Sequence, residues 1–254
     1  MGNKYDNMGA AISYDRSLRI KEDGFERVEE MNLTPQMKVL DIGSGPGILA
    51  LPLAGKVREV TVVEPSAAMR NLLRQHMEEE GIRNIRILPY LWEEVPEEEL
   101  GSYDLVIASY SLNMPDFKEA ALKMNRHSTG EVILYWFAGE TSWEKDARVL
   151  RERMGQPTAA RMPGKIGEFY QILYQAGIYC DICMLRETSF DREYETFELA
   201  LKDMKERYEI PDEEESVLIS YLEERLERTG HGWYYWDLTH YARMTWKAVP
   251  NLQG

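Results

Sequence analysis

The sequence predicts an α/β fold in which strands of a parallel sheet alternate with helices. Residues 39–42 form a short apolar run that suits a buried parallel strand. A turn with three alternating glycines follows at residues 43–47, and an apolar helix face then extends over residues 48–54. Because proline is favoured in the first turn of a helix, we expect this helix to start at Pro46.

The remaining elements are predicted from apolar runs bounded by turn signals and from helical spacing. Ser66 suits the N-cap of the helix after the second strand. Further strands are expected at residues 59–64, 85–90, 103–110, 131–137, 179–187 and 232–247. Helices are expected at residues 14–30, 66–80, 116–126 and 164–177.

The amino-acid composition limits the classes of protein to which this chain can belong. The apolar fraction of 44% and the charged fraction of 29% are ordinary for a soluble globular chain of 254 residues. The chain has neither a stretch of ~20 apolar residues nor the apolar core of a signal peptide, so we expect a cytoplasmic protein. A net charge of −14 repels phosphate backbones, which makes a nucleic-acid partner unlikely.

The two cysteines do not predict a metal site. Cys180 and Cys183 lie in a segment with the pattern of a strand, where residues three apart face opposite sides. The chain contains no second cysteine pair to complete a zinc site. We therefore expect two packed thiols and no metal.

The glycine turn is interpreted as a cofactor cradle. Glycines let the backbone turn sharply and approach a ligand, and the N–H groups of the turn and of the following helix point towards it. A tight connection without a ligand is the alternative. A dinucleotide fingerprint is excluded, because the position that requires its third glycine is Ile48.

The pattern Asp41-x-Gly43-x-Gly45-x-Gly47, followed by residues 61–66, resembles the first motifs of class I S-adenosylmethionine-dependent methyltransferases. The resemblance covers residues 37–137 and the later strands by topology only. It implies a doubly wound, mostly parallel seven-stranded sheet with an antiparallel last strand and, in this chain, a helical insertion. It also implies S-adenosylmethionine as the cofactor.

The resemblance also implies roles for individual residues. The glycine loop passes under the methionine end of the cofactor, and Glu64 accepts hydrogen bonds from both ribose hydroxyls. Met69 packs against the adenine ring, and Glu93 or backbone groups meet its amino group. Ser109 and Tyr110 lie beside the sulfonium and the incoming nucleophile. The candidate cofactor-binding residues are Asp41, Gly43, Ser44, Gly45, Gly47, Glu64, Pro65, Met69, Trp92, Glu93, Ser109 and Tyr110.

Residues 1–254 are expected to form one methyltransferase domain. Segment 1–34 is interpreted as an N-terminal lid, with Tyr5 and Tyr14 as candidate contacts of cofactor or substrate. Residues 138–163 are an insertion after the fifth strand. Residues 188–231 are expected to insert two amphipathic helices between the last two strands, as an acidic cap, as a homodimer surface, or simply packed on the sheet edge.

The function predicted is methyl transfer from S-adenosylmethionine to a small-molecule acceptor. One alternative is a non-catalytic S-adenosylmethionine-binding protein that acts through its acidic helical insertion, and another is a protein or RNA methyltransferase. The Asn/Asp-Pro-Pro-aromatic motif of amino-methylating nucleic-acid enzymes is absent after the fourth strand. Catalytic residues are not assigned; the candidates for a general base are His127, His231, His240, Tyr110 and Asp237.

Overall fold

The structure of the protein is a computed structural model that describes residues 8–9, 11–12, 15, 23–157, 164–185, 191–237, 239–250 and 252. The chain divides into two compact units. Unit 1 comprises Met1–Trp136, Gly164–Met184 and Ala242–Gly254, and unit 2 comprises Phe137–Pro163 and Leu185–Tyr241. The candidate cofactor residues all belong to unit 1.

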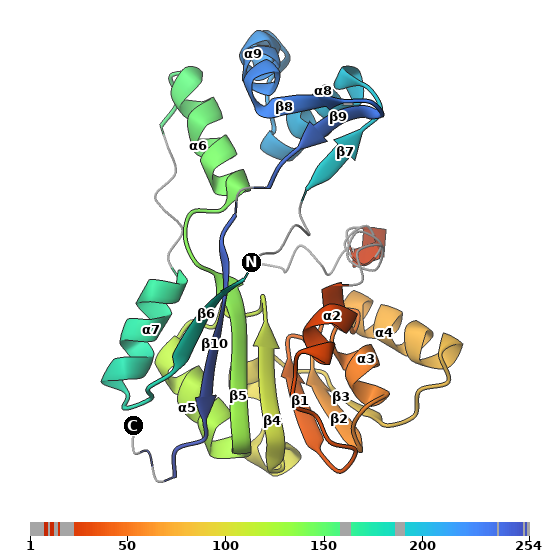
Figure 1. Ribbon diagram of the computed structural model, residues 1–254, viewed down its shortest axis with the longest axis vertical. Coiled ribbons are helices and arrows are strands. Elements are labelled where there is room, and N and C mark those ends of the chain that lie inside the picture. Colours follow the sequence, from red (N-terminus) through yellow and green to blue (C-terminus); the bar gives the residue numbers. More distant parts are fainter. Residues whose placement is uncertain are drawn as a thin grey trace. The chain divides into compact units, whose positions relative to one another are not determined.

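Unit 1 is built on a sheet that has seven strands in the described part of the chain, in the order β3-β2-β1-β4-β5-β10-β6 (Figure 1). The pairs β1–β2, β2–β3, β1–β4 and β4–β5 are parallel. This arrangement confirms the predicted mostly parallel sheet. The strands are β1 (Lys38–Ile42), β2 (Glu59–Val63), β3 (Ile85–Leu88), β4 (Tyr103–Ser109), β5 (Ser128–Phe137), β6 (Asp181–Leu185) and β10 (Tyr241–Lys247).

The strand order creates the place for a ligand. The chain proceeds from β1 to β2 and β3 on one side, and then returns to β4 on the other side of β1. Ile42 at the end of β1 is in register with Val63 of β2 and with Ala108 of β4. Open α/β sheets bind ligands at the carboxyl ends of their strands where the winding reverses, which here is between β1 and β4.

Helices cover both faces of this sheet, as right-handed crossovers in opposite directions require (Figure 1). On one side are α2 (Asp23–Glu29), α3 (Ala50–Ala54) and α4 (Ala67–Glu79), and on the other are α5 (Phe117–His127) and α7 (Ile166–Gln175). Two short 3-10 turns, η2 (Trp92–Glu94) and η3 (Glu97–Glu99), precede β4.

The prediction for the start of α3 was wrong. The helix begins at Ala50 and not at Pro46. Gly45 and Gly47 have φ values of +56° and +98°, which a right-handed helix does not accommodate. The prediction for Ser66 is confirmed, because its hydroxyl accepts a hydrogen bond from the N–H of Met69 at 3.3 Å and caps α4.

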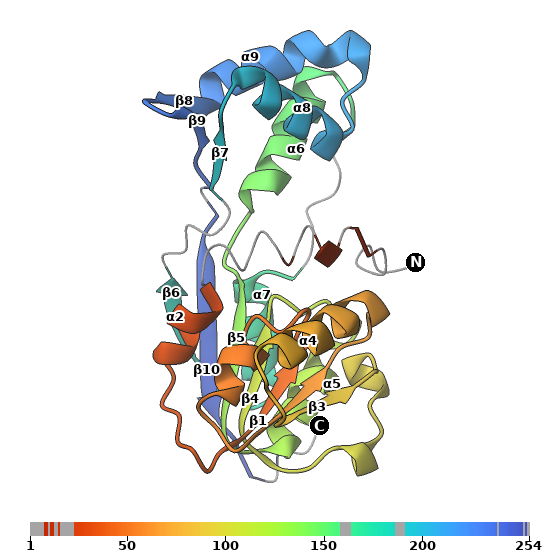
Figure 2. The same cartoon turned by 90° about the vertical axis from the view of Figure 1, so that its right-hand side faces the viewer.

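Unit 2 contains helices and a small sheet (Figure 2). The two helices predicted from hydrophobic spacing are present as α8 and α9, which pack against each other. Its described elements are α6 (Ser142–Arg153), β7 (Arg192–Tyr194), α8 (Phe197–Tyr208), η4 (Asp212–Glu214), α9 (Glu215–Arg225), β8 (Leu226–Thr229) and β9 (Gly232–Tyr235). The strands pair antiparallel in the order β7-β9-β8.

The predicted last strand over residues 232–247 is two strands in different sheets. β9 ends at Tyr235 and β10 begins at Tyr241. Between them, the Asp237 carboxylate accepts hydrogen bonds from the N–H of Thr239 at 3.1 Å and from the hydroxyl of Tyr241 at 2.5 Å. These bonds tie Asp237 to Thr239 and Tyr241, and the aromatic run does not continue as one strand.

The expectation of two packed thiols was also wrong. Cys180 is half-buried and Cys183 is exposed, because β6 is the edge strand of the sheet. In the part of the chain that the structure describes, no helix is long and apolar enough to cross a membrane.

Candidate functional site

The glycine loop connects β1 to α3 at the carboxyl edge of the sheet. Gly43 donates its N–H to the carbonyl of Val63 at 2.7 Å, and a Cβ at this position would clash with Ser111. A Cβ at Gly47 would lie 2.5 Å from a methyl carbon of Leu73 in α4. At Gly45 no described heavy atom lies within 4 Å of the position of a Cβ. Gly43 and Gly47 are thus required for packing, whereas Gly45 leaves open space above the loop.

Asp41 lies in β1 beneath this loop and is 2% exposed. Burial, and secondly the charge of Glu64, raise the pKa of Asp41 to about 7, while the charge of Arg27 opposes the rise. Asp41 Oδ2 and the nearby Ser44 hydroxyl are buried without a hydrogen-bond partner among the described residues. Since buried polar groups are nearly always bonded, these two atoms indicate a missing partner, such as a ligand.

Glu64 holds the end of β2 against the glycine loop. Its Oε2 accepts the N–H of Gly45 at 2.8 Å, and its Oε1 accepts the N–H of Ser66 at 2.8 Å. Arg70 donates to the carbonyl oxygens of Glu64 at 2.8 Å and of Pro65 at 2.6 Å. The carboxylate is therefore fixed beside the open space above Gly45, although it is only 5% exposed.

These features fit S-adenosylmethionine. The cofactor carries two positive groups and two vicinal hydroxyls, all of which favour carboxylate partners. Asp41 offers an oxygen that has no hydrogen-bond partner among the described residues. Glu64 offers a carboxylate that the N–H of Gly45 holds in place. The loop N–H groups and the space above Gly45 complete the cradle.

Ser109 and Tyr110 lie at the carboxyl end of β4, next to β1. Tyr110 has a φ of 53°, which is rare for a non-glycine residue, and its N–H donates to the carbonyl of Tyr135 at 3.1 Å. Such backbone strain concentrates at functional sites. The structure therefore places these two predicted residues at the edge of the sheet where the ligand is expected.

Arg27 of α2 was missed by the sequence analysis. Its Nη1 donates to the Ser109 hydroxyl at 2.6 Å. Its guanidinium carbon lies 5.4 Å from the ring centroid of Tyr110 and 5.3 Å from that of Tyr135. No pattern in the sequence singles out Arg27, and only the structure shows that a Cβ at Gly24, three residues earlier, would clash with the carbonyl of Ile48. That glycine lets α2 approach the loop and brings Arg27 over the strand ends.

Met69, Trp92 and Glu93 lie in different surroundings. Met69 is 2% exposed and packs in a small cluster with Ala11 and two residues of α4. Trp92 is buried, and its indole N–H donates to the carbonyl of Ala120 at 3.1 Å. Glu93 is exposed in η2. A contact of these three residues with the cofactor stays a prediction.

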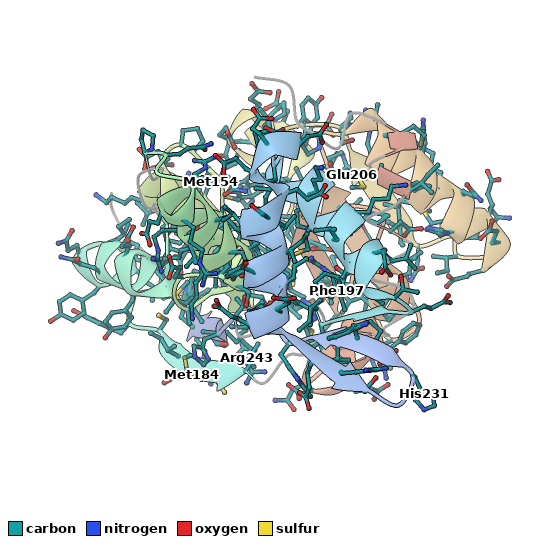
Figure 3. The ribbon with its side chains drawn as sticks, turned by 90° about the horizontal axis from the view of Figure 1, so that it is seen from above. Met154, Met184, Phe197, Glu206, His231 and Arg243 are labelled. Carbon is teal, nitrogen blue, oxygen red and sulfur yellow. The ribbon has the colours of Figure 1, made fainter. Side chains whose placement is uncertain are left out.

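Of the five candidate bases, Tyr110 alone lies among the predicted cofactor residues. His127 ends α5 just before the amino end of β5, which is the opposite edge of the sheet. The other three belong to unit 2. His231 is exposed at the turn between β8 and β9 (Figure 3), and His240 is exposed. Asp237 accepts hydrogen bonds from Thr239 and Tyr241. Tyr5 and Tyr14 lie outside the described residues.

Comparisons with known proteins indicate a methyltransferase domain. The family profile described as a methyltransferase domain matches residues 39–129. A ubiquinone biosynthesis O-methyltransferase from Acinetobacter baylyi is 39% identical over 69 residues, which cover 27% of this chain and 29% of that protein. An uncharacterized protein from Haemophilus influenzae is 25% identical over 224 residues, which cover 83% of this chain and 78% of that protein.

A solved structure shows the same fold. Magnesium protoporphyrin IX methyltransferase from Synechocystis, crystallised with bound SAH, superposes with a TM-score of 0.51 at 16% identity, over 96% of this chain and 88% of that chain. The family profile places a methyltransferase domain at residues 39–129, and the strand order is that of the class I S-adenosylmethionine-dependent methyltransferase fold. S-adenosylmethionine is the cofactor of this class.

Proposed function

We propose that the protein transfers a methyl group from S-adenosylmethionine to a small-molecule acceptor at the carboxyl ends of β1 and β4. The observation that carries the proposal is the Asp41 carboxylate, which is buried beneath the glycine loop with one oxygen lacking a partner among the described residues. The names of two related proteins, a ubiquinone biosynthesis O-methyltransferase and a magnesium protoporphyrin IX methyltransferase, support a small-molecule acceptor. The net charge of −14 argues against a nucleic acid.

When bound, S-adenosylmethionine supplies an activated methyl group. The chain's own residues bind and orient the reactants. Glu64 accepts hydrogen bonds from ribose hydroxyls, and the backbone of residues 43–47 supports the methionine end. Asp41 loses its proton when a positive group binds beside it, since its pKa of about 7 leaves it partly protonated at neutral pH.

Ser109 and Tyr110 face the acceptor in this proposal. The Tyr110 hydroxyl forms a hydrogen bond with the nucleophilic atom of the methyl acceptor, either as donor or as acceptor of the bond. The strained backbone at Tyr110 fixes the direction of the ring. No residue needs to form a covalent intermediate, because the reaction is a direct displacement at the methyl group. The lid role of residues 1–34, the two insertions, a homodimer and a cytoplasmic location stay predictions.

Transfer of labelled methyl groups tests the proposal. We expect the purified protein to move tritium from methyl-labelled S-adenosylmethionine into a small-molecule extract of cells, in preference to total protein or total RNA from those cells. Glu64→Gln, checked for folding by circular dichroism, is expected to lose most of this transfer. Label only in protein or RNA would contradict a small-molecule acceptor. Cofactor binding without transfer to any fraction would favour a non-catalytic binding protein.

A further inference from the structure

An arginine of α4 reaches back to the end of β2. Arg70 lies in the first turn of α4, and its backbone N–H donates to the carbonyl of Ser66 at 3.0 Å. Helical side chains point towards the N-terminus of their helix, so the Arg70 side chain lies over the preceding turn. Its Nη1 donates to the carbonyl oxygens of Glu64 at 2.8 Å and of Pro65 at 2.6 Å. One guanidinium nitrogen carries two hydrogens and therefore serves both bonds.

The helix dipole does not favour a cation at this position. The first turn of a helix carries a partial positive charge, which repels a nearby arginine. The first turn of α4 contains no acidic residue that would offset this repulsion. The charge-assisted bonds to the two carbonyl oxygens offset it instead. The contacts at the end of β2 are therefore what favours this arrangement of Arg70.

One peptide group links Arg70 to the carboxylate of Glu64. The carbonyl of Pro65 accepts the bond from Arg70, and the N–H of the same peptide group, that of Ser66, donates to Glu64 Oε1 at 2.8 Å. A charge-assisted bond to a carbonyl polarises the peptide group, which strengthens the donation by its N–H. The position of the carboxylate therefore depends on how Arg70 holds this peptide group.

The backbone around Pro65 needs such an anchor. The proline ring restricts Glu64 to extended conformations, but Pro65 has no N–H with which to hold its own position. Arg70 binds the carbonyls on both sides of the proline ring. On the other side of the carboxylate, Oε2 accepts the N–H of Gly45 at 2.8 Å. Each carboxylate oxygen has two lone-pair positions, so each keeps one for a further donor.

We propose that Arg70 is a positioning residue for the cofactor site. It holds the peptide group between Pro65 and Ser66, so that both oxygens of the Glu64 carboxylate face the two ribose hydroxyls. The inference rests on the proposed function and adds a residue that acts on the cofactor only through Glu64. The chemical group that Arg70 helps to recognise is a vicinal diol.

Two ligands that differ only at the ribose distinguish positioning from a general structural role. S-adenosylhomocysteine and its 2′,3′-dideoxy analogue, which has no hydroxyl for Glu64, are titrated calorimetrically into the wild type and Arg70→Met. We expect the affinity for S-adenosylhomocysteine to fall about five- to tenfold in Arg70→Met, because part of a hydrogen bond to a charged group is lost. The affinity for the dideoxy analogue should stay within about twofold. A merely structural role would weaken the binding of both ligands by the same factor.

Arg74→Met is the matched control. Arg74 lies one turn further along α4, and its guanidinium donates to the exposed side chain of Asn71 at 3.2 Å. The substitution removes the same charge from the same helix, and both affinities should stay within about twofold of the wild type. In a Glu64→Gln background, Arg70→Met should have little further effect, because Arg70 acts through that carboxylate.

Hydrogen exchange tests the same contact in the free protein. The amides of Gly45 and Ser66 both donate to the Glu64 carboxylate. We expect both amides to exchange about fivefold faster in Arg70→Met and at an unchanged rate in Arg74→Met. Arg70→Lys retains a cation with donors, so its effect should be smaller. It keeps the test available if Arg70→Met does not fold.

Three results would overturn the inference. These are an equal loss of affinity for both ligands, unchanged affinities in folded Arg70→Met, and unchanged exchange of Gly45 and Ser66. Failure of the proposed function gives a different result, because the folded wild type would then bind no S-adenosylhomocysteine. Hydrogen exchange in the free protein would in that case decide whether Arg70 holds Glu64.

Discussion

The two units each bury an aspartate, and the two carboxylates differ in their partners. Asp146 of α6, in unit 2, is 1% exposed and accepts hydrogen bonds from three tyrosine hydroxyls, those of Tyr208 at 2.9 Å, Tyr221 at 2.5 Å and Tyr235. Asp41, in unit 1, is 2% exposed, and its Oδ2 has no partner among the described residues. Burial alone therefore does not distinguish a functional carboxylate from a structural one. The distinction lies in whether the protein itself satisfies the carboxylate.

The tyrosines around Asp146 are suited to permanent donation. Burial, followed by the charge of Asp146, raises the pKa of Tyr208, Tyr221 and Tyr235 well above the ordinary value. All three hydroxyls therefore stay protonated. The Arg225 side chain adds a cation 4.0 Å from the carboxylate. This network joins α6, α8, α9 and β9 around the apolar core of unit 2.

The largest expected effect is that of Asp146→Ala. Removing the carboxylate leaves three tyrosine hydroxyls without their acceptor and takes away the negative charge beside Arg225, so we expect the unfolding free energy of unit 2 to fall by about 3–5 kcal/mol. Denaturant unfolding with hydrogen exchange of α8 and α9 measures it. Asp212→Ala is the control, since the Asp212 side chain is 95% exposed and its ion pair with Lys205 should contribute little to stability. A similar loss in both variants would contradict the structural role of Asp146.

Asp41→Asn should have a smaller effect of the opposite sign. Because the pKa of Asp41 is raised from 3.8 to about 7 in the folded state, the folded protein binds this proton more tightly than the unfolded chain. Stability from this group is present below about pH 4 and is lost as the pH rises to about 7. Between pH 5 and pH 8 the wild type should therefore lose about 2–4 kcal/mol of unfolding free energy through this group. The Asp41→Asn variant, whose amide does not titrate, should not show this loss.

Denaturant midpoints of both proteins at pH 5 and pH 8 check this prediction. The same substitution should weaken cofactor binding, because the amide cannot take a negative charge. If the stabilities of the wild type and Asp41→Asn changed in parallel with pH, other protein groups would already satisfy the Asp41 carboxylate, as they do for Asp146.

The smallest effect comes from a second contrast between the units. Tyr110 and Glu209 both have a φ of 53°. Glu209 is exposed at the end of α8, where glycine is the favoured residue, so Glu209→Gly should stabilise the protein by about 1 kcal/mol. Tyr110→Gly relieves similar strain but removes the ring beside Arg27, so methyl transfer should fall at nearly unchanged stability. If Tyr110→Gly retained full methyl transfer, the strained Tyr110 would have only a structural role, as Glu209 has.

The sequence was sufficient for the parts of the site that are local in the chain. Asp41, the glycine loop and Glu64 follow directly from two short strands, and a single strand with its turn places each of them. Arg27 of α2 and Tyr135 of β5 come together only in the folded chain. Their spacing in the sequence contains no such information.

The errors in the fold have similar causes. The helix α6 was not predicted, although Thr141 and Glu144 form a capping box at its start. Its charged residues weaken the hydrophobic spacing on which the prediction depended. The continuous aromatic run after residue 232 concealed the break between β9 and β10, where Asp237 accepts side-chain and backbone hydrogen bonds.

The measurement that tests the central claim most directly is a calorimetric titration of the wild type, Glu64→Gln and Glu59→Gln with S-adenosylmethionine. Glu59 is the matched control, because it lies at the other end of β2 from Glu64. We predict micromolar binding by the wild type and by Glu59→Gln, and a loss of ~1.5–3 kcal/mol in Glu64→Gln, the scale of a hydrogen bond to a charged group. Equal binding by all three proteins, or no binding by the folded wild type, would contradict the account of the glycine loop, Asp41 and Glu64 as the cofactor site.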